Sequence, residues 1–272
     1  MSDGFSLFTS LRYDAGLKQV PVKGLEHAAW NLKNESSFYM LDYHRDRMLR
    51  AATHWQWKDA IDVLSGDEAL VTLANLTEEF IGSDLDKPRR VKIVVDRQGK
   101  ISFESSVTLP VSLENLFPIR LPPPGSAPAK DEPRVFPRWA VVPDDLNTAR
   151  SEYTHYKTTQ RDMYDSARRR VVIALTDEKE VLLTNKEDGS IMEGSMTTPY
   201  FWRDGRWVTP PVSSKFSLED GSGGQDGTSR RWALERGIVV EQVVKAESLV
   251  DGEECWISNG VRGFIAGVIR LK

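Results

Sequence analysis

The chain has 272 residues, of which 40% are hydrophobic and 28% charged, a composition that excludes a disordered or fibrous chain. Its 36 Lys and Arg against 40 Asp and Glu give a formal charge of −4, so no overall basic field attracts nucleic acid or an anionic membrane. The single cysteine, Cys255, excludes an intramolecular disulfide and a cysteine-based zinc site. We expect a soluble cytoplasmic protein with no metal centre, no nucleic-acid partner and no membrane partner.

The first 110 residues carry signals for both strands and helices. Residues 5–13 are rich in aromatic and β-favouring side chains and predict a strand. Residues 40–57 place apolar side chains three and four apart, which predicts an amphipathic helix, and a second helix is expected over 67–80. The alternating segments 89–96 and 100–109 predict a β-hairpin.

A proline-rich stretch follows. Nine of the 14 prolines fall between Pro110 and Pro143. Because proline removes backbone donors and disfavours helix, this region is interpreted as a connection between two folded halves, either a plain linker or an ordered loop that covers a site. We therefore expect an N-terminal α/β domain over 1–120, the connection over 121–139 and a C-terminal domain over 140–272.

The second half again mixes the two element types. Residues 151–170 predict a loop followed by a helix that ends in three arginines. Short strands are expected at 171–176, 180–184, 191–197 and 200–203. Further elements are expected as a helix over 228–236, a strand over 239–244, a short helix over 246–250 and two strands around Asn259. The fold class is therefore mixed α and β.

Several segments could carry chemistry, but each is weak alone. The glycine-rich residues 221–227 precede a helix whose first N–H groups could bind a phosphate, or they form a mobile surface loop. Lys157 follows a ring and precedes hydroxyls, yet most lysines are solvated surface charges. Arg47 could equally lie on a solvated helix face, whereas Glu193 on a half-buried strand needs a partner. The four histidines show no metal-ligand spacing.

Six blocks give these segments a common interpretation. They are Leu7–Arg12, His44–Ala52, Lys157–Arg161 with Tyr164, Glu193–Thr197, Gly227–Arg231 and Asn259–Gly263. In this order they resemble the fold-type IV pyridoxal-phosphate enzymes, the class IV aminotransferase-like family, over most of the chain. The resemblance implies a two-domain fold like that of D-amino acid aminotransferases, with pyridoxal 5'-phosphate bound between the domains.

The resemblance also implies roles for particular residues. Lys157 would hold the cofactor aldehyde and shuttle protons, and Glu193 would face the pyridine nitrogen and keep it protonated. Arg47 would bind the cofactor phosphate. The other cofactor-binding positions implied are Gly227, Thr228, Ser229, Asn259 and Gly260, where Gly260 replaces a hydroxyl residue often found in relatives.

Substrate-binding residues are implied less directly. The candidates are Ser10, Arg12, Arg161 and Arg262. Ser10 would orient the leaving group or assist proton transfer, and the arginines would pair with carboxylates. Arg161 could instead brace the loop beside it.

Within the family, the blocks look most like the members that convert 4-amino-4-deoxychorismate to 4-aminobenzoate and pyruvate in folate biosynthesis. The substrate would then be a small amine with two carboxylates. One alternative is a transaminase of D-amino acids, branched-chain amino acids or amines, and another is a degenerate cofactor-binding protein without turnover. The resemblance implies a homodimer in each case.

Overall fold

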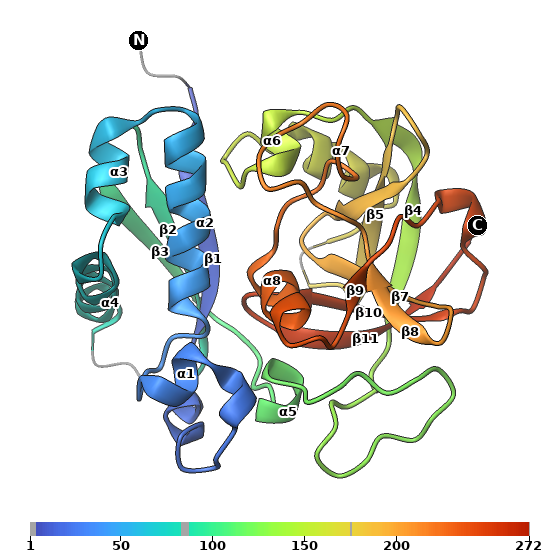
Figure 1. Ribbon diagram of the computed structural model, residues 1–272, viewed down its shortest axis with the longest axis horizontal. Helices are drawn as coiled ribbons and strands as arrows, with labels where there is room; N and C mark the ends of the chain where they lie inside the picture. Colours follow the sequence, from blue (N-terminus) through green and yellow to red (C-terminus); the bar gives the residue numbers. More distant parts are fainter. Residues whose placement is uncertain (1–3, 83–86, 175, 272) are drawn as a thin grey trace. The chain divides into compact units, whose positions relative to one another are not determined.

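The computed structural model describes residues 4–82, 87–174 and 176–271. The chain divides into two compact units (Figure 1). Unit 1 comprises Met1–Leu113 and Tyr156–Gln160, and unit 2 comprises Glu114–His155 and Arg161–Lys272. The proline-rich residues 121–139 therefore group with unit 2, and a pentapeptide that contains Lys157 leaves unit 2 to join unit 1.

Unit 1 is built on an antiparallel sheet of order β1–β2–β3. The strands are β1 (Leu7–Tyr13), β2 (Arg89–Val95) and β3 (Ile101–Val107). Its helices are η1 (Ala15–Gln19), η2 (Glu26–Ala28), α1 (Trp30–Lys33), α2 (Leu41–His54), α3 (Lys58–Leu64) and α4 (Glu68–Ile81). Helix α2 contacts β1 and helix α4 contacts β3 (Figure 1). The predicted first strand, hairpin and two helices are confirmed, whereas α3 was not predicted.

The alternation of side chains along β1 and β2 gives the sheet two different faces. On one face Leu7, Leu11, Val91 and Ile93 are fully buried, and Thr9 of the same face reaches α2. On the other face Ser10 is the register partner of Lys92. The two-residue period therefore separates the unit's apolar core from a polar face.

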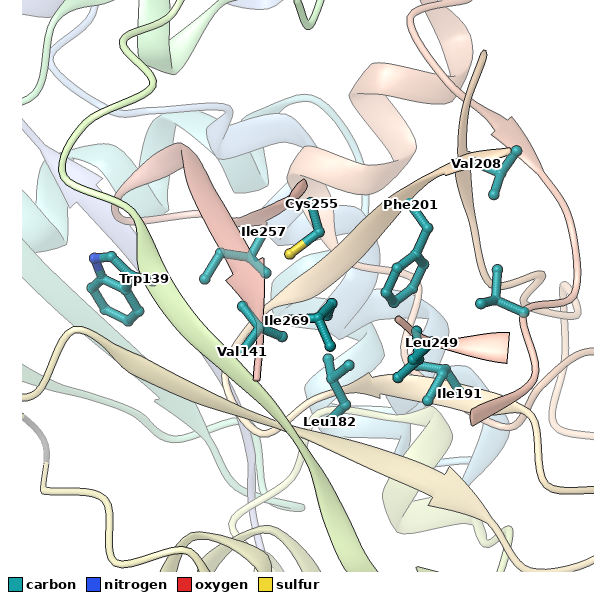
Figure 2. Packing of buried hydrophobic residues seen from close by; sticks show 11 residues of the cluster. Trp139, Val141, Leu182, Ile191, Phe201, Val208, Leu249, Cys255, Ile257 and Ile269 are labelled. Atoms are coloured by element: carbon teal, nitrogen blue, oxygen red, sulfur yellow. The ribbon is translucent and has the colours of Figure 1, made fainter. Parts of the chain in front are cut away.

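Unit 2 contains an eight-stranded sheet of order β6–β5–β4–β11–β10–β7–β8–β9. The strands are β4 (Trp139–Thr148), β5 (Lys179–Asn185), β6 (Ile191–Gly194), β7 (Thr198–Arg203), β8 (Arg206–Thr209), β9 (Val240–Glu241), β10 (Glu254–Asn259) and β11 (Gly263–Ile269). Apolar side chains from seven of these strands pack together, among them Leu182, Phe201, Ile257 and Ile269 (Figure 2). Cys255 lies in this core, where burial raises the pKa of its thiol. The cysteine is therefore a packing residue.

The helices of unit 2 are short. They are α5 (Leu113–Leu116), α6 (Glu152–His155), α7 (Asp162–Arg170), α8 (Thr228–Glu235) and η3 (Ala246–Ser248). Helix α7 packs on β4 and β5. Helices α7 and α8 confirm the sequence-based expectations, and the predicted strand over 239–244 shortens to β9.

The predicted strand over 171–176 is wrong for its described residues. Val171 caps the C-terminus of α7, and Val172 has a left-handed backbone with φ of 52°. Arg168 Nη2 then donates a hydrogen bond to the Ala174 carbonyl at 2.9 Å. The β-branched residues thus form the turn that ends a helix, while Leu175 lies outside the described residues.

Candidate functional site

Lys157 is fixed in unit 1 by strand-like pairing with β1. The Phe8 amide donates to the Lys157 carbonyl at 3.2 Å, and the Thr159 amide donates to the Ser6 carbonyl at 2.9 Å. An antiparallel bridge joins Leu7 to Thr158 between these two bonds. The backbone on both sides of the lysine is therefore held by an element more than 140 residues away in sequence.

Aromatic rings surround the lysine segment within unit 1. The Lys157 Nζ lies 5.0 Å from the centroid of the Phe8 ring. The neighbouring Tyr156 ring packs 4.5 Å from the His54 ring and 5.2 Å from the Trp55 ring, measured between centroids. These contacts restrict Tyr156 and so orient the residue that follows it.

Arg47, Thr9 and His44 form a hydrogen-bonded chain in the same unit. Arg47 Nη2 donates to Thr9 Oγ1 at 2.5 Å, and Thr9 Oγ1 lies 2.6 Å from His44 Nδ1. Because a guanidinium can only donate, Thr9 Oγ1 is the acceptor from Arg47, while the direction of its bond with His44 follows the tautomer of the ring. Burial lowers the pKa of His44 well below its ordinary value, and the charges of Arg47 and Lys157 add to this effect. The imidazole is therefore neutral.

Two predicted substrate residues of β1 have different surroundings. Ser10 Oγ accepts a hydrogen bond from Arg90 Nη2 at 3.1 Å. The Arg12 side chain is completely buried, and its guanidinium donates to Asp14 Oδ2 at 2.8 Å and to the Leu109 carbonyl at 3.0 Å. Arg12 is thus bound to groups of its own unit, while its substrate role stays a prediction.

Glu193 lies on β6 of unit 2 and is only 7% exposed. Its Oε1 accepts from the Tyr164 hydroxyl at 2.6 Å, and Gln225 Nε2 donates to that same hydroxyl oxygen at 2.9 Å. Burial, followed by the charge of Glu193, raises the pKa of Tyr164 well above its ordinary value. The phenol therefore stays neutral and serves as a donor that stabilises the carboxylate.

A second carboxylate, Glu180, holds the turn that follows Glu193. It is fully buried at the start of β5. Its Oε1 accepts from the Ser195 hydroxyl at 2.6 Å and amide at 3.1 Å, and its Oε2 accepts from the Met196 amide at 3.2 Å and the Thr197 hydroxyl at 2.8 Å. Glu180 therefore supplies the acceptors that order the backbone after β6.

The glycine-rich loop before α8 packs closely on its own unit. A Cβ on Gly224 would lie 2.5 Å from the Met192 carbonyl oxygen, and one on Gly227 would lie 2.7 Å from Thr198 Oγ1. Both contacts are too short for any side chain. Close packing thus accounts for these glycines without a ligand, so their number alone does not indicate a phosphate site.

Buried hydroxyls follow at the first turn of α8. Thr228 and Ser229 are 3% and 1% exposed. Ser229 Oγ lies 2.7 Å from Ser258 Oγ, which lies 2.7 Å from the Tyr200 hydroxyl. The first N–H groups of a helix have no acceptor within it, so this end of α8 presents donors and partial positive charge.

The remaining predicted residues also lie in unit 2. Asn259 Oδ1 accepts from the amides of Val261 at 3.0 Å and Arg262 at 2.9 Å, which shapes the turn that contains Gly260. The Arg262 guanidinium lies over the Trp139 ring, 4.8 Å from its centroid. Arg161 Nη2 donates to the Ser195 carbonyl at 2.8 Å, and its guanidinium lies 4.5 Å from the centroid of the Tyr164 ring.

The structure therefore places Lys157, Arg47, Ser10 and Arg12 in unit 1. The other predicted residues lie in unit 2. Sequence reasoning missed Thr9, Glu180, Gln225 and Arg90. The two-residue period could have placed Thr9 toward α2 and Arg90 beside the Ser10 face. Nothing local marks Glu180 or Gln225, because their partners lie far along the chain.

The described part of the chain shows neither a metal cluster nor a membrane-spanning helix. No group of three or more His, Cys, Asp or Glu side chains there is arranged to hold a metal ion. None of the helices described is long and apolar enough to cross a membrane.

Comparisons with known proteins agree on one family. A family model described as "Amino-transferase class IV" matches residues 29–268. "Aminodeoxychorismate lyase" of Saccharomyces cerevisiae is 31% identical over 150 residues, which are 49% of this chain and 38% of that protein. A "Putative aminodeoxychorismate lyase" of Schizosaccharomyces pombe is 30% identical over 119 residues, 43% of this chain and 48% of that protein. The matches span less than half of either relative.

Solved structures share the fold over nearly the whole chain. A "Putative amino-acid aminotransferase" from Mesorhizobium loti superposes with a TM-score of 0.66 at 19% identity, covering 97% of this chain and 99% of that one. A "putative 4-amino-4-deoxychorismate lyase" from Haemophilus somnus gives 0.56 at 13% identity and 96% and 98% coverage. A "hypothetical aminotransferase" from Mycobacterium tuberculosis in a "PLP-bound form" gives 0.58 at 13% identity and 98% and 82% coverage. The predicted fold class is confirmed.

Proposed function

Because this chain belongs to the class IV aminotransferase family, we propose that it is a pyridoxal 5'-phosphate-dependent lyase that converts 4-amino-4-deoxychorismate to 4-aminobenzoate and pyruvate. The observation that carries the proposal is Lys157, held by pairing with β1 in the same unit as the Arg47–Thr9–His44 chain. The similarity to two proteins named for this lyase activity favours this reaction over the other reactions of the family.

The side chains present fit the proposed cofactor. An aldehyde requires an amine, which Lys157 supplies, and a phosphate requires cationic and N–H donors, which Arg47 and the first turn of α8 supply. A protonated pyridine nitrogen requires a carboxylate, and Glu193, which accepts from the Tyr164 hydroxyl, supplies one. When bound, pyridoxal phosphate supplies an electron sink for a developing carbanion.

Lys157 would act as the base of the reaction. Its Nζ would remove the proton from the substrate ring carbon that carries the amine, and it must be neutral to do so. The Phe8 ring, whose centroid lies 5.0 Å from Nζ, provides an apolar surface beside the amine. The pairing with β1 fixes the backbone of Lys157, so only its side chain would move during proton transfer.

Glu193 would hold a proton at the pyridine nitrogen. Its negative charge favours the protonated form of a neighbouring base. Tyr164 and Gln225 fix the position of that charge, because each makes a hydrogen bond in the chain that ends on the carboxylate. Glu180 would contribute indirectly by ordering the turn after Glu193.

The remaining predicted site residues have proposed roles in binding the phosphate and the substrate. Arg47 and the amides of Thr228 and Ser229 would bind the phosphate, and the turn at Asn259 and Gly260 would lie beside it. Ser10 would contact the substrate. We also propose a homodimer, which light scattering at micromolar protein concentration would detect as twice the mass of one chain.

The first test measures cofactor and products. Purified protein mixed with pyridoxal phosphate should gain a visible absorbance band and should form pyruvate and 4-aminobenzoate in equal amounts without an added keto acid. In Lys157→Ala the band should be lost and the rate should fall by about 10³-fold or more. Lys100→Ala, on the exposed hairpin turn, is the control for losing a lysine and should retain both.

Two results would contradict the proposal. A colourless protein that ignores added cofactor would exclude the pyridoxal-phosphate chemistry. Amino-group transfer to a keto acid without 4-aminobenzoate would exclude the lyase and favour a transaminase of the same family.

A second test separates the role of Glu193 from a structural one. Glu193→Gln keeps the shape and the acceptor for Tyr164 but removes the charge, so the rate should fall by about 10²-fold while the free energy of unfolding changes by less than about 1 kcal/mol. Urea unfolding and product assays on the same preparation measure both. Equal losses of activity and stability would show that the carboxylate only supports the fold.

A further inference from the structure

The polar face of the unit 1 sheet places two cations around one hydroxyl. Ser10 on β1 is the register partner of Lys92 on β2, and Arg12 is the partner of Arg90. Arg90 Nη2 reaches diagonally to Ser10 Oγ at 3.1 Å. Since residues two apart share a face, Arg90 and Lys92 lie on the same face of β2, with Lys92 directly opposite Ser10 and Arg90 diagonal to it.

Arg90 differs from two arginines of this unit that have carboxylate partners. Arg12 is paired with Asp14 and Arg45 with Asp46. Within residues 4–82, 87–174 and 176–271, Arg90 pairs with no carboxylate, and its hydrogen bond goes to a neutral hydroxyl. A guanidinium has five N–H donors, so most of its capacity remains for an anion, and Ser10 can add its own proton as a further donor.

Lys92 adds a second positive charge at the edge of this group. Its Nζ lies 2.8 Å from Glu104 Oε1, but the Glu104 side chain is 61% exposed. An exposed pair of this kind contributes little free energy, so a bound carboxylate can compete for the lysine. Arg90 is therefore the main anchor and Lys92 an auxiliary one.

The group is connected to Lys157 through one ring. Phe8 lies two residues before Ser10 on the same face of β1. Its ring centroid is 5.0 Å from Lys157 Nζ and 5.3 Å from Lys92 Nζ. The reactive amine and the cationic group thus contact the same side chain.

We propose that Arg90, with Ser10 and Lys92, binds a substrate carboxylate that lies across a six-membered ring from the reacting amine. Ser10 lies two residues beyond Phe8 on β1, so a carboxylate bound at Ser10 would lie roughly 6–7 Å from the Phe8 position. That displacement suits a carboxylate para to an amine and is too long for the carboxylate of an α-amino acid. The inference rests on the proposed function, because it gives the proposed site its selectivity for the lyase substrate.

The kinetic test compares matched arginine variants of the cofactor-loaded enzyme. Arg90→Gln should raise KM for 4-amino-4-deoxychorismate by about 10–100-fold while kcat changes by less than about 3-fold, as expected when a charged hydrogen bond that forms on binding is lost. Arg90→Lys should recover part of the affinity. Arg97→Gln removes the same charge from the exposed turn of the same hairpin and should leave KM unchanged. Equal KM values for the Gln variants at 90 and 97 would overturn the proposal.

A binding measurement tests the proposal without requiring turnover. The probe is 4-aminobenzoate, whose carboxylate lies para to its amine, and its neutral analogue 4-aminobenzamide is the control ligand. Calorimetry should give a dissociation constant for 4-aminobenzoate at least about 10-fold larger in Arg90→Gln than in the wild type, with no change for the amide. A wild-type protein that binds both compounds equally well would overturn the proposal.

The two tests distinguish the two proposals. A wild-type enzyme that forms 4-aminobenzoate with a KM insensitive to Arg90→Gln keeps the lyase function and loses the carboxylate site. A protein without lyase activity whose affinity for 4-aminobenzoate depends on Arg90 keeps the carboxylate site and loses the proposed reaction.

Discussion

Partly buried cations of unit 1 and a buried carboxylate of unit 2 have different kinds of partner. In unit 1 the cations Arg47 and Arg90 donate to the hydroxyls of Thr9 and Ser10. In unit 2 the carboxylate Glu180 accepts from amides and hydroxyls of the turn after β6. A neutral hydroxyl leaves a positive charge in place, so unit 1 remains attractive to anions, whereas hydrogen bonds to a carboxylate fix the backbone that donates them.

We propose that the unit 1 cations serve binding and that the Glu180 carboxylate serves the fold. A guanidinium oriented by a hydroxyl keeps both its charge and most of its donors for a ligand. A carboxylate surrounded by donors from one turn is already used by that turn. Variants of Glu180, Thr9 and His44 therefore test this difference between the units.

The largest effect is expected at Glu180. Glu180→Ala leaves the donors of Ser195, Met196 and Thr197 buried without their acceptor, so the free energy of unfolding should fall by about 3–5 kcal/mol. Urea unfolding measures this change. Glu178→Ala, two residues earlier and exposed, is the control and should change stability by less than about 0.5 kcal/mol. A small change at Glu180 would show that water satisfies these donors equally well.

A smaller effect is expected at Thr9. Thr9→Val keeps the shape but removes the oxygen between Arg47 and His44, so the dissociation constant for pyridoxal phosphate should rise by about 5–20-fold. Thr9→Ser retains the hydroxyl and should restore most of the affinity. Titration of cofactor-free protein followed by absorbance provides the constants, with Thr53→Val on the outer side of α2 as the control. If the valine variant binds as tightly as the wild type, the hydroxyl does not orient Arg47.

The smallest effect is the pH dependence caused by His44. Burial and the charges of Arg47 and Lys157 lower the pKa of His44 in the folded state, whereas the unfolded chain titrates near the ordinary value of 6.5. Below that pH the unfolded state binds more protons, so the contribution of neutral His44 is complete above about pH 6.5 and is lost as the pH falls.

Urea unfolding at pH 7.5 and 5.5 measures this loss. Over that interval the wild type should lose about 1 kcal/mol more stability than His44→Gln, whose amide can still form a hydrogen bond with Thr9 but does not titrate. Identical losses in the two proteins would mean that His44 can be protonated without cost, contrary to its burial.

Local periodicity accounts for the parts of the fold that were predicted correctly. The alternation over residues 89–109 gave the hairpin, and apolar spacing over 40–57 gave α2. Strand β4 was missed because Pro143 and two aspartates interrupt its apolar run, and the register of β4 with β5 does shift between Pro143 and Asn147. Residues 171–174 have strand-like composition but follow the C-terminus of α7 without forming a strand, since tertiary contacts override a weak preference.

The family, the mixed fold and the residue types of the proposed site could be predicted from the sequence, because they follow from local patterns and short motifs such as Lys157–Arg161 and Glu193–Thr197. The unit that holds Lys157 is known only from the three-dimensional contacts. The same is true of the hydroxyls that contact Arg47 and Arg90 and of the carboxylate that orders the turn after β6. These facts depend on pairing between residues far apart in sequence, such as Phe8 with Lys157 and Ser10 with Arg90. Hydrogen bonds of this kind leave no local pattern in the sequence. The residues that flank one partner do not depend on whether the other partner is present.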